Sequence, residues 1–264
     1  MTVATFLDAT FLDNPWVVAA AVNSVLIGLA FALPKKLLTP AGYVNAWLLG
    51  VIVWGALGWP GYVTVLFYFL VGSTVTKVGM AEKEAFGIAE ARGGVRGPGN
   101  VWGSALSGTV CALLLVLIQG VKPAQPVDID LWSSLLALGF VASLSTKLSD
   151  TTATEIGKAY GQRTFLITTL RPVSRGTEGA VSLEGTLAGI LGSVALAIVA
   201  WAVGLITLSG VSICAIAAFI ATTIESLIGA TVEEKLSWLT HDLVNIINTT
   251  IGACVAIGLG YLWR

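Results

Sequence analysis

Long apolar stretches alternate with short polar connections along almost the whole chain. Runs close to the roughly 20 residues that a helix needs to cross a bilayer recur from Pro15 onward. The pattern predicts eight membrane-spanning helices, at about 15–33, 42–58, 61–76, 101–121, 131–148, 184–206, 209–231 and 241–262. The expected fold class is therefore all-α: a polytopic integral membrane protein in which residues 1–264 form a single membrane domain.

The composition supports a membrane protein. Hydrophobic residues make up 56% of the chain and charged residues only 11%, whereas charged residues are about a quarter of a soluble domain. The segment before Pro15 holds no Lys or Arg and so lacks the basic start of a signal peptide. Cys111, Cys214 and Cys254 each lie in an apolar run without CxxC or Cys/His spacing, which indicates packing residues rather than metal ligands.

The basic residues collect on one side of the predicted membrane topology. With the N-terminus outside, that side holds Lys35, Lys36, Lys77, Lys83, Arg92, Arg96, Lys147, Lys158, Arg163, Arg171, Arg175 and Lys235, and the other holds Lys122 and Arg264. The positive-inside rule assigns the basic side to the cytoplasm. Three segments there, at about 77–104, 145–186 and 230–245, contain almost all the polar groups that could do chemistry. We therefore expect the active site on the cytoplasmic face.

The stretch "STKLSDTTATEIGKAYG" at 145–161 places four charges at the end of an apolar run. They are Lys147, Asp150, Glu155 and Lys158. Asp150, Gly157 and Gly161 fall on one side of a helix, where the two glycines let a backbone or a phosphate approach closely. A structural alternative is that Asp150 favours a helix N-terminus and that Thr152 with Glu155 forms a capping box.

Two further segments combine arginine with glycine. "RPVSRGTEGAVSLEGTLAG" at 171–189 contains Arg171, Arg175, Gly176, Glu178, Gly179, Ser182, Glu184 and Gly185. Ser182 and Glu184 also fit an ordinary helix start, but Arg with loop glycines suits a phosphate-holding loop. "ARGGVRGPGNVWGS" at 91–104 repeats the combination with Arg92, Arg96, Gly97 and Asn100 ahead of a helix. It is either an anion site or a plain surface loop.

A carboxylate and two amides lie inside the last two predicted spans. Burying a carboxylate at mid-membrane costs about 2.5–3.5 kcal/mol on the insertion scale, so Glu225 should face the bundle interior with a partner. A hydrogen bond to Asn245 or Asn248 is one interpretation, and a role in metal or phosphate binding is the other. His241, beside Asp242, suits a helix start better than a catalytic base.

Carboxylates facing arginines and glycine loops form the constellation used for phosphoryl transfer. Carboxylates hold a divalent metal, while Arg and backbone N–H groups stabilise transition-state charge. The expected metal is Mg²⁺ or Mn²⁺, on Asp150, Glu155 and Glu184. The adjoining apolar spans would take a lipid tail, so a lipid phosphate could meet a nucleoside triphosphate at the inner interface. No strong base is needed, because the acceptor is already a phosphate anion.

Four motifs carry a resemblance to a known family. "RGPGNVWGSALSG", "KLSDTTATEIGKAYG", "RGTEGAVSLEGTLAG" and "WLTHDLVNIINTTIGA" resemble those of the transmembrane-protein-19-like family, which includes the phytyl-phosphate kinases of plants and cyanobacteria. The resemblance spans about 72–260. It implies conversion of phytyl or related prenyl monophosphates to diphosphates for tocopherol and phylloquinone synthesis. It also implies a bacterial inner, thylakoid or plastid envelope membrane.

A fainter resemblance concerns the CTP-using dolichol and phytol kinases and the phosphatidate cytidylyltransferases. Their Asp-xx-Ala-xxx-Gly-xxx-Gly element is matched by Asp150, Ala153, Gly157 and Gly161. Their second element, Lys-Ser/Thr-x-Glu-Gly, is matched except that Val181 replaces the lysine. The missing cation would then come from Arg175, Arg171 or Lys158.

The hypothesis is a prenyl-phosphate kinase that uses CTP or another nucleoside triphosphate. The alternatives are a CTP-dependent lipid-phosphate cytidylyltransferase and a lipid or anion transporter. We expect the membrane, the prenyl phosphate and the nucleotide as partners and no nucleic acid, with oligomerisation left open. The catalytic candidates are Asp150, Glu184, Arg175 and Glu225. The substrate- or nucleotide-binding candidates are Arg96, Gly97, Asn100, Lys147, Glu155, Gly157, Lys158, Gly161, Arg171, Glu178, Gly185, Asn245 and Asn248.

Overall fold

The computed structural model describes residues 14–120, 128–232, 236 and 238–263. Within these residues, seven helices are long and apolar enough to cross a membrane. They are α2 Pro15–Ala32, α3 Pro40–Val75, α5 Pro98–Gly120, α6 Ile129–Tyr160, α7 Leu183–Ala202, α8 Leu208–Thr231 and α9 His241–Leu262. The predicted all-α, polytopic fold class is confirmed. Lys122, Lys235 and Arg264, which entered the topology prediction, lie outside the described residues.

The helices begin where short polar side chains can cap them. The side chains of Asn14, Thr39, Ser182, Thr207 and Thr240 each accept a hydrogen bond from a backbone N–H in the first turn of the helix that follows. Such caps satisfy N–H groups that have no partner within the helix. Proline occupies the first turn of α2 and α3, where its missing N–H costs nothing.

The 36-residue helix α3 folds back on itself at Gly58. Gly58 has φ +66° and ψ −164°, a conformation open almost only to glycine. A Cβ on Gly42 would lie 2.7 Å from the Arg96 carbonyl oxygen, and one on Gly72 would lie 2.7 Å from the Arg96 guanidinium, so the two ends of α3 meet at Arg96. The two arms correspond to the predicted spans 42–58 and 61–76, which accounts for the expected eight crossings.

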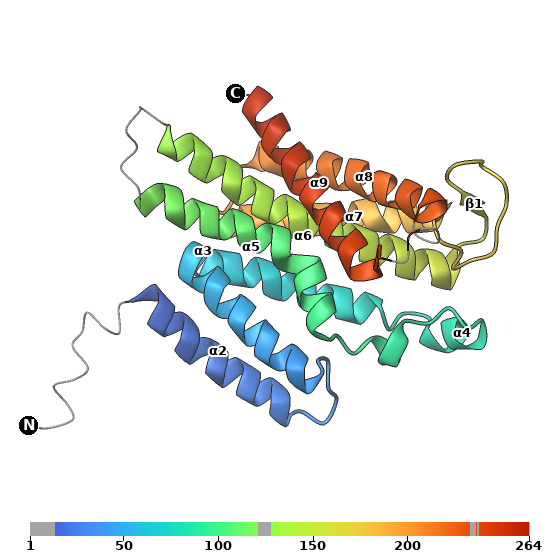
Figure 1. The fold of residues 1–264 in the computed structure, drawn as a ribbon, viewed down its shortest axis with the longest axis horizontal. Coiled ribbons are helices and arrows are strands. Elements are labelled where there is room, and N and C mark those ends of the chain that lie inside the picture. The colour runs from blue at the N-terminus through green and yellow to red at the C-terminus, as the bar shows by residue number, and fades with distance from the viewer. Residues whose placement is uncertain (1–13, 121–127, 233–235, 237, 264) are drawn as a thin grey trace, which may run out of the picture.

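Helix α6 lies at the centre of the bundle and is the most buried of the seven long helices. It packs against α5, α7, α8 and α9 (Figure 1). The predicted span 131–148 and the helical pattern predicted from Asp150 to Gly161 form one continuous helix, because α6 runs to Tyr160. Its 32 residues span roughly 48 Å at 1.5 Å per residue, more than the roughly 30 Å hydrocarbon core. The capping-box interpretation of Thr152 and Glu155 is wrong, since both lie inside the helix.

The short elements gather at one end of the bundle, here called the loop end (Figure 1). They are α4 Met80–Ala85, the 3-10 turn η2 Ala91–Gly94, β1 Thr164–Leu166 and β2 Ala180–Ser182. The two strands pair antiparallel, with Phe165 opposite Val181, and the sequence pattern did not predict them. Apart from Lys147, which lies inside α6, every described Lys and Arg lies in or beside the connections at this end of the bundle. The polar chemistry of the described chain is thus concentrated there.

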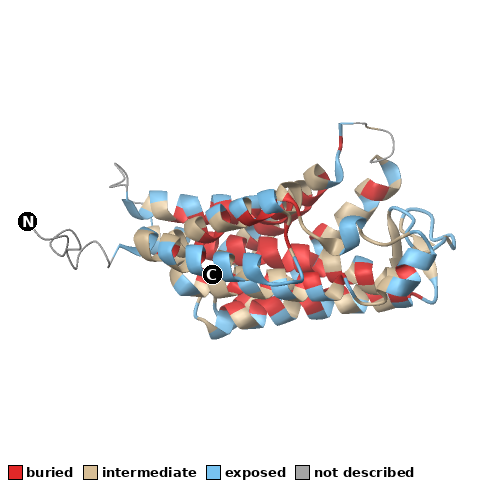
Figure 2. Cartoon of the chain, turned by 90° about the horizontal axis from the view of Figure 1, so that it is seen from below, coloured by how far each residue is buried: buried red, intermediate tan, exposed pale blue. Residues whose placement is uncertain are grey.

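Burial follows the bundle axis. Figure 2 shows buried residues along the middle of the bundle, with exposed residues on its outer faces and in the loops. The exposed outer positions are largely apolar, as with Leu29 of α2, Leu191 of α7 and Phe219 of α8. Large exposed apolar side chains on the sides of a helix bundle are expected where lipid, rather than water, surrounds the protein.

Candidate functional site

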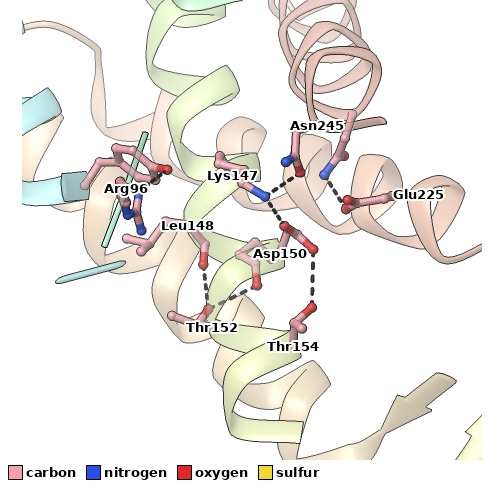
Figure 3. A network of polar contacts seen from close by, with 11 residues as sticks. Arg96, Lys147, Leu148, Asp150, Thr152, Thr154, Glu225 and Asn245 are labelled. Carbon is pink, nitrogen blue, oxygen red and sulfur yellow. Dashed lines mark hydrogen bonds and ion pairs between the residues drawn. The ribbon is translucent and has the colours of Figure 1, made fainter. Parts of the chain in front are cut away.

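A buried ion pair stands on α6 toward the loop end. Lys147 is 7% exposed and pairs with Asp150, three residues on along the helix. The Lys147 ammonium also donates to the side-chain oxygen of Asn245 on α9 at 2.6 Å. Thr154 lies 3.4 Å from the other carboxylate oxygen of Asp150 (Figure 3). A buried charge needs a partner of opposite sign and further hydrogen bonds, and this cluster supplies both.

Glu225 of α8 faces the same cluster from the other side (Figure 3). Its carboxylate accepts a hydrogen bond of 2.5 Å from the side-chain nitrogen of Asn248 on α9. The structural interpretation, a hydrogen bond between Glu225 and an asparagine, is confirmed for Asn248. The side-chain oxygen of Asn248 is buried without a hydrogen-bond partner among the described residues. Glu225 also lines a pocket, so its hydrogen bond with Asn248 is compatible with a place in the candidate site.

Arg96 is held at the ends of α3. Its guanidinium donates to the Tyr68 hydroxyl at 2.8 Å and lies over the rings of Tyr68 and Phe69, 5.3 and 5.9 Å from their centroids. Its backbone pairs with the chain around Leu38 as an isolated bridge. These contacts hold the Arg96 guanidinium in place at the loop end. Because the guanidinium is already held, it loses little freedom when it binds an anion.

The segment that follows Arg96 starts α5. The Asn100 side-chain oxygen accepts from the Gly97 backbone N–H at 3.0 Å and from the Arg92 guanidinium at 3.3 Å. Arg92 itself has φ +55°, which is uncommon for a residue with a side chain. The loop is therefore tightly folded, and the Asn100 side-chain oxygen is used in hydrogen bonds that hold its shape.

Glu155 has a different environment from the one predicted for it. It forms an ion pair with Lys83 of α4, whose side chain is fully buried. The Lys83 ammonium also donates to the carbonyl of Thr76, at the end of α3, at 2.7 Å. Lys83 therefore joins α3, α4 and α6. Nothing in the sequence pattern indicated this role, because Lys83 lies among charged loop residues.

The glycines of α6 permit a close helix contact. A Cβ on Gly185 of α7 would lie 2.6 Å from the Ala153 carbonyl, and one on Gly157 would lie 3.3 Å from the Ser182 hydroxyl. Gly161 ends α6 and also packs on Ser182. The close approach of a second backbone, predicted from Gly157 and Gly161, is present, and the partner is the first turn of α7.

Of the predicted site residues between α6 and the first turn of α7, some line a pocket and others do not. Arg175 donates to the Ala159 carbonyl at 3.0 Å and lies over the Phe86 ring. Glu178 is exposed and lines a pocket. Glu184 is outside the pocket walls and lies 3.4 Å from the Gln162 backbone N–H. Arg171 is exposed and also lies outside both pockets. The structure thus groups Arg175 and Glu178 with Asp150, but not Arg171 or Glu184.

Two pockets meet along one face of α6. The larger, about 150 Å³, lies between α6, the start of α7, the end of α8 and the 175–182 loop. The smaller, about 90 Å³, lies between α6, the starts of α5 and α9, and the 90–96 loop. Four residues line both: Asp150, Thr154, Lys158 and His241. The ion-paired carboxylate of Asp150 therefore stands where the two spaces join.

The predicted metal ligands are not brought together. Among the described residues no group of three or more His, Cys, Asp and Glu side chains could hold a metal ion, and Glu155 is paired with Lys83. Asp150 and Glu225 do line the same pocket. Mg²⁺ commonly uses only one or two protein carboxylates and takes its other ligands from water and substrate phosphates. The pair Asp150 and Glu225 fits that requirement, whereas the trio with Glu155 and Glu184 does not.

Some pocket residues were not among the predicted site residues. His241 is the first residue of α9, as the helix-start interpretation expected, and it also lines both pockets. Thr222 and Ser226 of α8 line the larger pocket beside Glu225. Their spacing of four residues, with Glu225 between them, places all three on neighbouring positions of one helix face. This spacing is visible in the sequence and could have predicted that Thr222 and Ser226 accompany Glu225 in the candidate site.

Comparison with known proteins agrees with the motif resemblance. The model of the family "Integral membrane protein DUF92" matches residues 23–253. An uncharacterized membrane protein of Synechocystis sp. is 59% identical over 93% of this chain and 91% of its own. Protein VTE6, chloroplastic, of Arabidopsis thaliana is 46% identical over 92% of this chain and 71% of its own. An uncharacterized membrane protein of Methanocaldococcus jannaschii is 28% identical over 89% and 92%. No solved structure matches the chain.

The matched residues include α3 and the loop-end site. All four motifs, the ion pair on α6 and both pockets lie inside the range 23–253. On this evidence the chain belongs to the DUF92 family of integral membrane proteins.

Proposed function

We propose that the protein is a prenyl-phosphate kinase, which transfers the γ-phosphoryl group of a nucleoside triphosphate to a prenyl monophosphate. One observation carries the proposal: Asp150 lies at the junction of two pockets, with Arg175 in the wall of one and Arg96 in the wall of the other. Two adjoining sites with cations suit a reaction between two phosphate-bearing substrates. The motif resemblance and the kinship with Protein VTE6 support the same chemistry.

In the proposed reaction, a phosphate oxygen of the prenyl monophosphate attacks the γ-phosphorus of the nucleotide. The bond between that phosphorus and the bridging oxygen breaks, and the products are a prenyl diphosphate and a nucleoside diphosphate. Arg96 and Arg175 would orient the two phosphate groups and balance charge in the transition state. Mg²⁺, held by Asp150 and Glu225, would screen the nucleotide phosphates. Lys147 would keep the Asp150 carboxylate in place.

We further propose that the loop end faces the cytoplasm, in a cyanobacterial plasma or thylakoid membrane or an equivalent plastid membrane. The basic residues that lie there support this orientation through the positive-inside rule. The arrangement would give a water-soluble nucleotide access to the pockets, while the prenyl chain stays in the bilayer. CTP and ATP are the donors to compare first, and phytyl and farnesyl monophosphate the acceptors.

The position of the radioactive label in the lipid product tests the reaction. The purified protein is incubated with phytyl monophosphate, Mg²⁺ and CTP or ATP labelled at either the α- or the γ-phosphorus, and the lipids are separated by chromatography. We expect γ-label in a lipid diphosphate. Transfer of α-label would instead identify a cytidylyltransferase that releases pyrophosphate, and it would overturn the kinase proposal.

Asp150→Asn is the matched test of the site. We expect a fall in kcat of at least about a hundredfold, because the neutral amide keeps the shape but loses the charge that holds the metal. Asp130→Asn, on the exposed first turn of the same helix at the opposite end, should keep full activity. Full activity in a correctly inserted Asp150→Asn protein would show that the site is elsewhere.

A further inference from the structure

The two pockets differ in their balance of charge. Asp150, Glu178 and Glu225 line the larger pocket, opposite Lys158 and Arg175. Once Lys147, the ion-pair partner of Asp150, is counted, three carboxylates face three cations. His241 lines both pockets, so it does not change the difference in net charge between them. The larger pocket is thus close to neutral, and a phosphate gains little there unless a cation arrives with it.

The smaller pocket carries an excess of positive charge. Glu90, Asp150 and Glu155 line it, opposite Arg96, Lys147 and Lys158. Glu155 is already neutralised by Lys83, which is buried behind it. Counting that partner, four cations stand against three carboxylates. This pocket can therefore hold a phosphate group without a metal ion.

Size and anchoring agree with the charge difference. The smaller pocket has about 90 Å³ and the larger about 150 Å³, in keeping with a phosphate monoester and a longer triphosphate. The main cation of the smaller pocket is Arg96, stacked on Tyr68 and Phe69 of the membrane helix α3. A head group bound by Arg96 is thus held against a membrane helix, where its hydrocarbon tail can stay in lipid.

We infer that the smaller pocket is the subsite for the prenyl monophosphate, which binds there without metal, and that the larger pocket receives the nucleotide as its magnesium complex. This assignment rests on the proposed kinase function and adds the place of each substrate. Thr154, Lys158 and His241, which line both pockets beside Asp150, then lie at the junction across which the phosphoryl group passes.

Equilibrium binding, without turnover, tests the assignment. The purified protein in detergent is titrated with farnesyl monophosphate in the presence of EDTA, and separately with CTP and Mg²⁺. Arg96→Gln should weaken farnesyl monophosphate binding by about tenfold or more and leave nucleotide binding unchanged, because a charge-assisted contact is lost in the smaller pocket only. The matched variant Arg175→Gln should do the reverse.

A variant that binds farnesyl monophosphate more tightly serves as a control, because misfolding would weaken binding. Glu90 lines the smaller pocket only, and Glu90→Gln removes a like charge near the bound phosphate. It should tighten farnesyl monophosphate binding several-fold, a result that damage to the fold does not produce. Glu178→Gln, in the wall of the larger pocket only, should leave the metal-free titration unchanged.

Two results would overturn the assignment. One is a reversed pattern, in which Arg175→Gln rather than Arg96→Gln weakens metal-free farnesyl monophosphate binding. The other is inorganic phosphate binding as tightly as farnesyl monophosphate in EDTA, which would make the smaller pocket a site for free phosphate. Neither depends on turnover. A protein that makes no lipid diphosphate would end the kinase proposal, while the binding pattern would still decide the two subsites.

Discussion

At the scale of single residues, the site is governed by how buried charges are paired. Lys147 and Lys83 are both nearly inaccessible, yet each meets a carboxylate on α6 and an oxygen from another helix. A charge removed from water without such partners is strongly destabilising. The difference between the two pairs lies in what surrounds them. Asp150 lines both pockets, whereas Glu155 lines only the smaller one and is paired with the fully buried Lys83.

A glycine on α9 gives a residue-scale prediction. A Cβ on Gly252 would collide with the Thr146 hydroxyl of α6, so Gly252→Ala should destabilise the protein by about 1–3 kcal/mol through overpacking. Gly258→Ala on the same helix meets nothing within 4 Å and should be neutral or slightly stabilising, because alanine favours helix. Thermal unfolding of both variants in detergent measures the difference. Equal midpoints would mean that α6 and α9 are not packed as described.

At the scale of elements, the reversal of α3 depends on one backbone conformation. Gly58→Ala should cost about 1–3 kcal/mol, because φ +66° with ψ −164° strains any residue with a Cβ. Gly28→Ala, inside α2 with no neighbour within 4 Å, is the matched control and should not destabilise. The comparison is made by unfolding in detergent. A tolerated alanine at 58 would argue that the chain continues straight there.

The attachment of α4 gives a second prediction at this scale. Lys83→Met should destabilise the protein by about 3–5 kcal/mol, since the Glu155 carboxylate then stays buried without its partner. The double variant Lys83→Met with Glu155→Gln should recover most of that loss. Unfolding of the single and double variants forms a double-mutant cycle. If the two losses simply add, Lys83 and Glu155 do not interact.

The elements were predictable to different degrees. Apolar run length predicted every described long helix, and the paired runs on either side of Gly58 predicted the two arms of α3. The length of α6 was not predictable from hydropathy. Its last turns carry charges, and Gly157, Gly185 and Lys83 allow α7 and α4 to pack against those turns. That stabilisation comes from tertiary contacts, which periodicity does not contain.

At the scale of the whole molecule, the orientation can be tested chemically. Residues Thr177, at the loop end, and Ser209, at the start of α8, are exposed at opposite ends of the bundle. Each is changed to cysteine in a background without Cys111, Cys214 and Cys254. In intact cells a membrane-impermeant maleimide should label the cysteine at 209 but not the one at 177, and both after lysis. The opposite pattern would place the loop end outside.

The gathering of the candidate residues at one end of the bundle was predictable from the sequence, but the pairing of their side chains was not. The clustering of Arg, Gly and carboxylates in three connections predicted that residues such as Arg96, Asp150 and Arg175 would lie at one end of the bundle. The proximity of Glu225 to Asp150 and the diversion of Glu155 to Lys83 depend on how α4, α8 and α9 are rotated. A one-dimensional pattern shows the face of each helix, not the neighbour that this face meets.

The three-residue spacing of Lys147 and Asp150 also bears on how the protein is made. Asn245, the other partner of Lys147, lies 98 residues further along the chain and is synthesised much later. Until then α6 must enter the bilayer with only its own side chains to neutralise its charge. Because the two ions face each other within one turn, the helix carries its counter-ion with it into the membrane. The same pair that lies in the proposed catalytic site would therefore also lower the cost of inserting α6 into the bilayer.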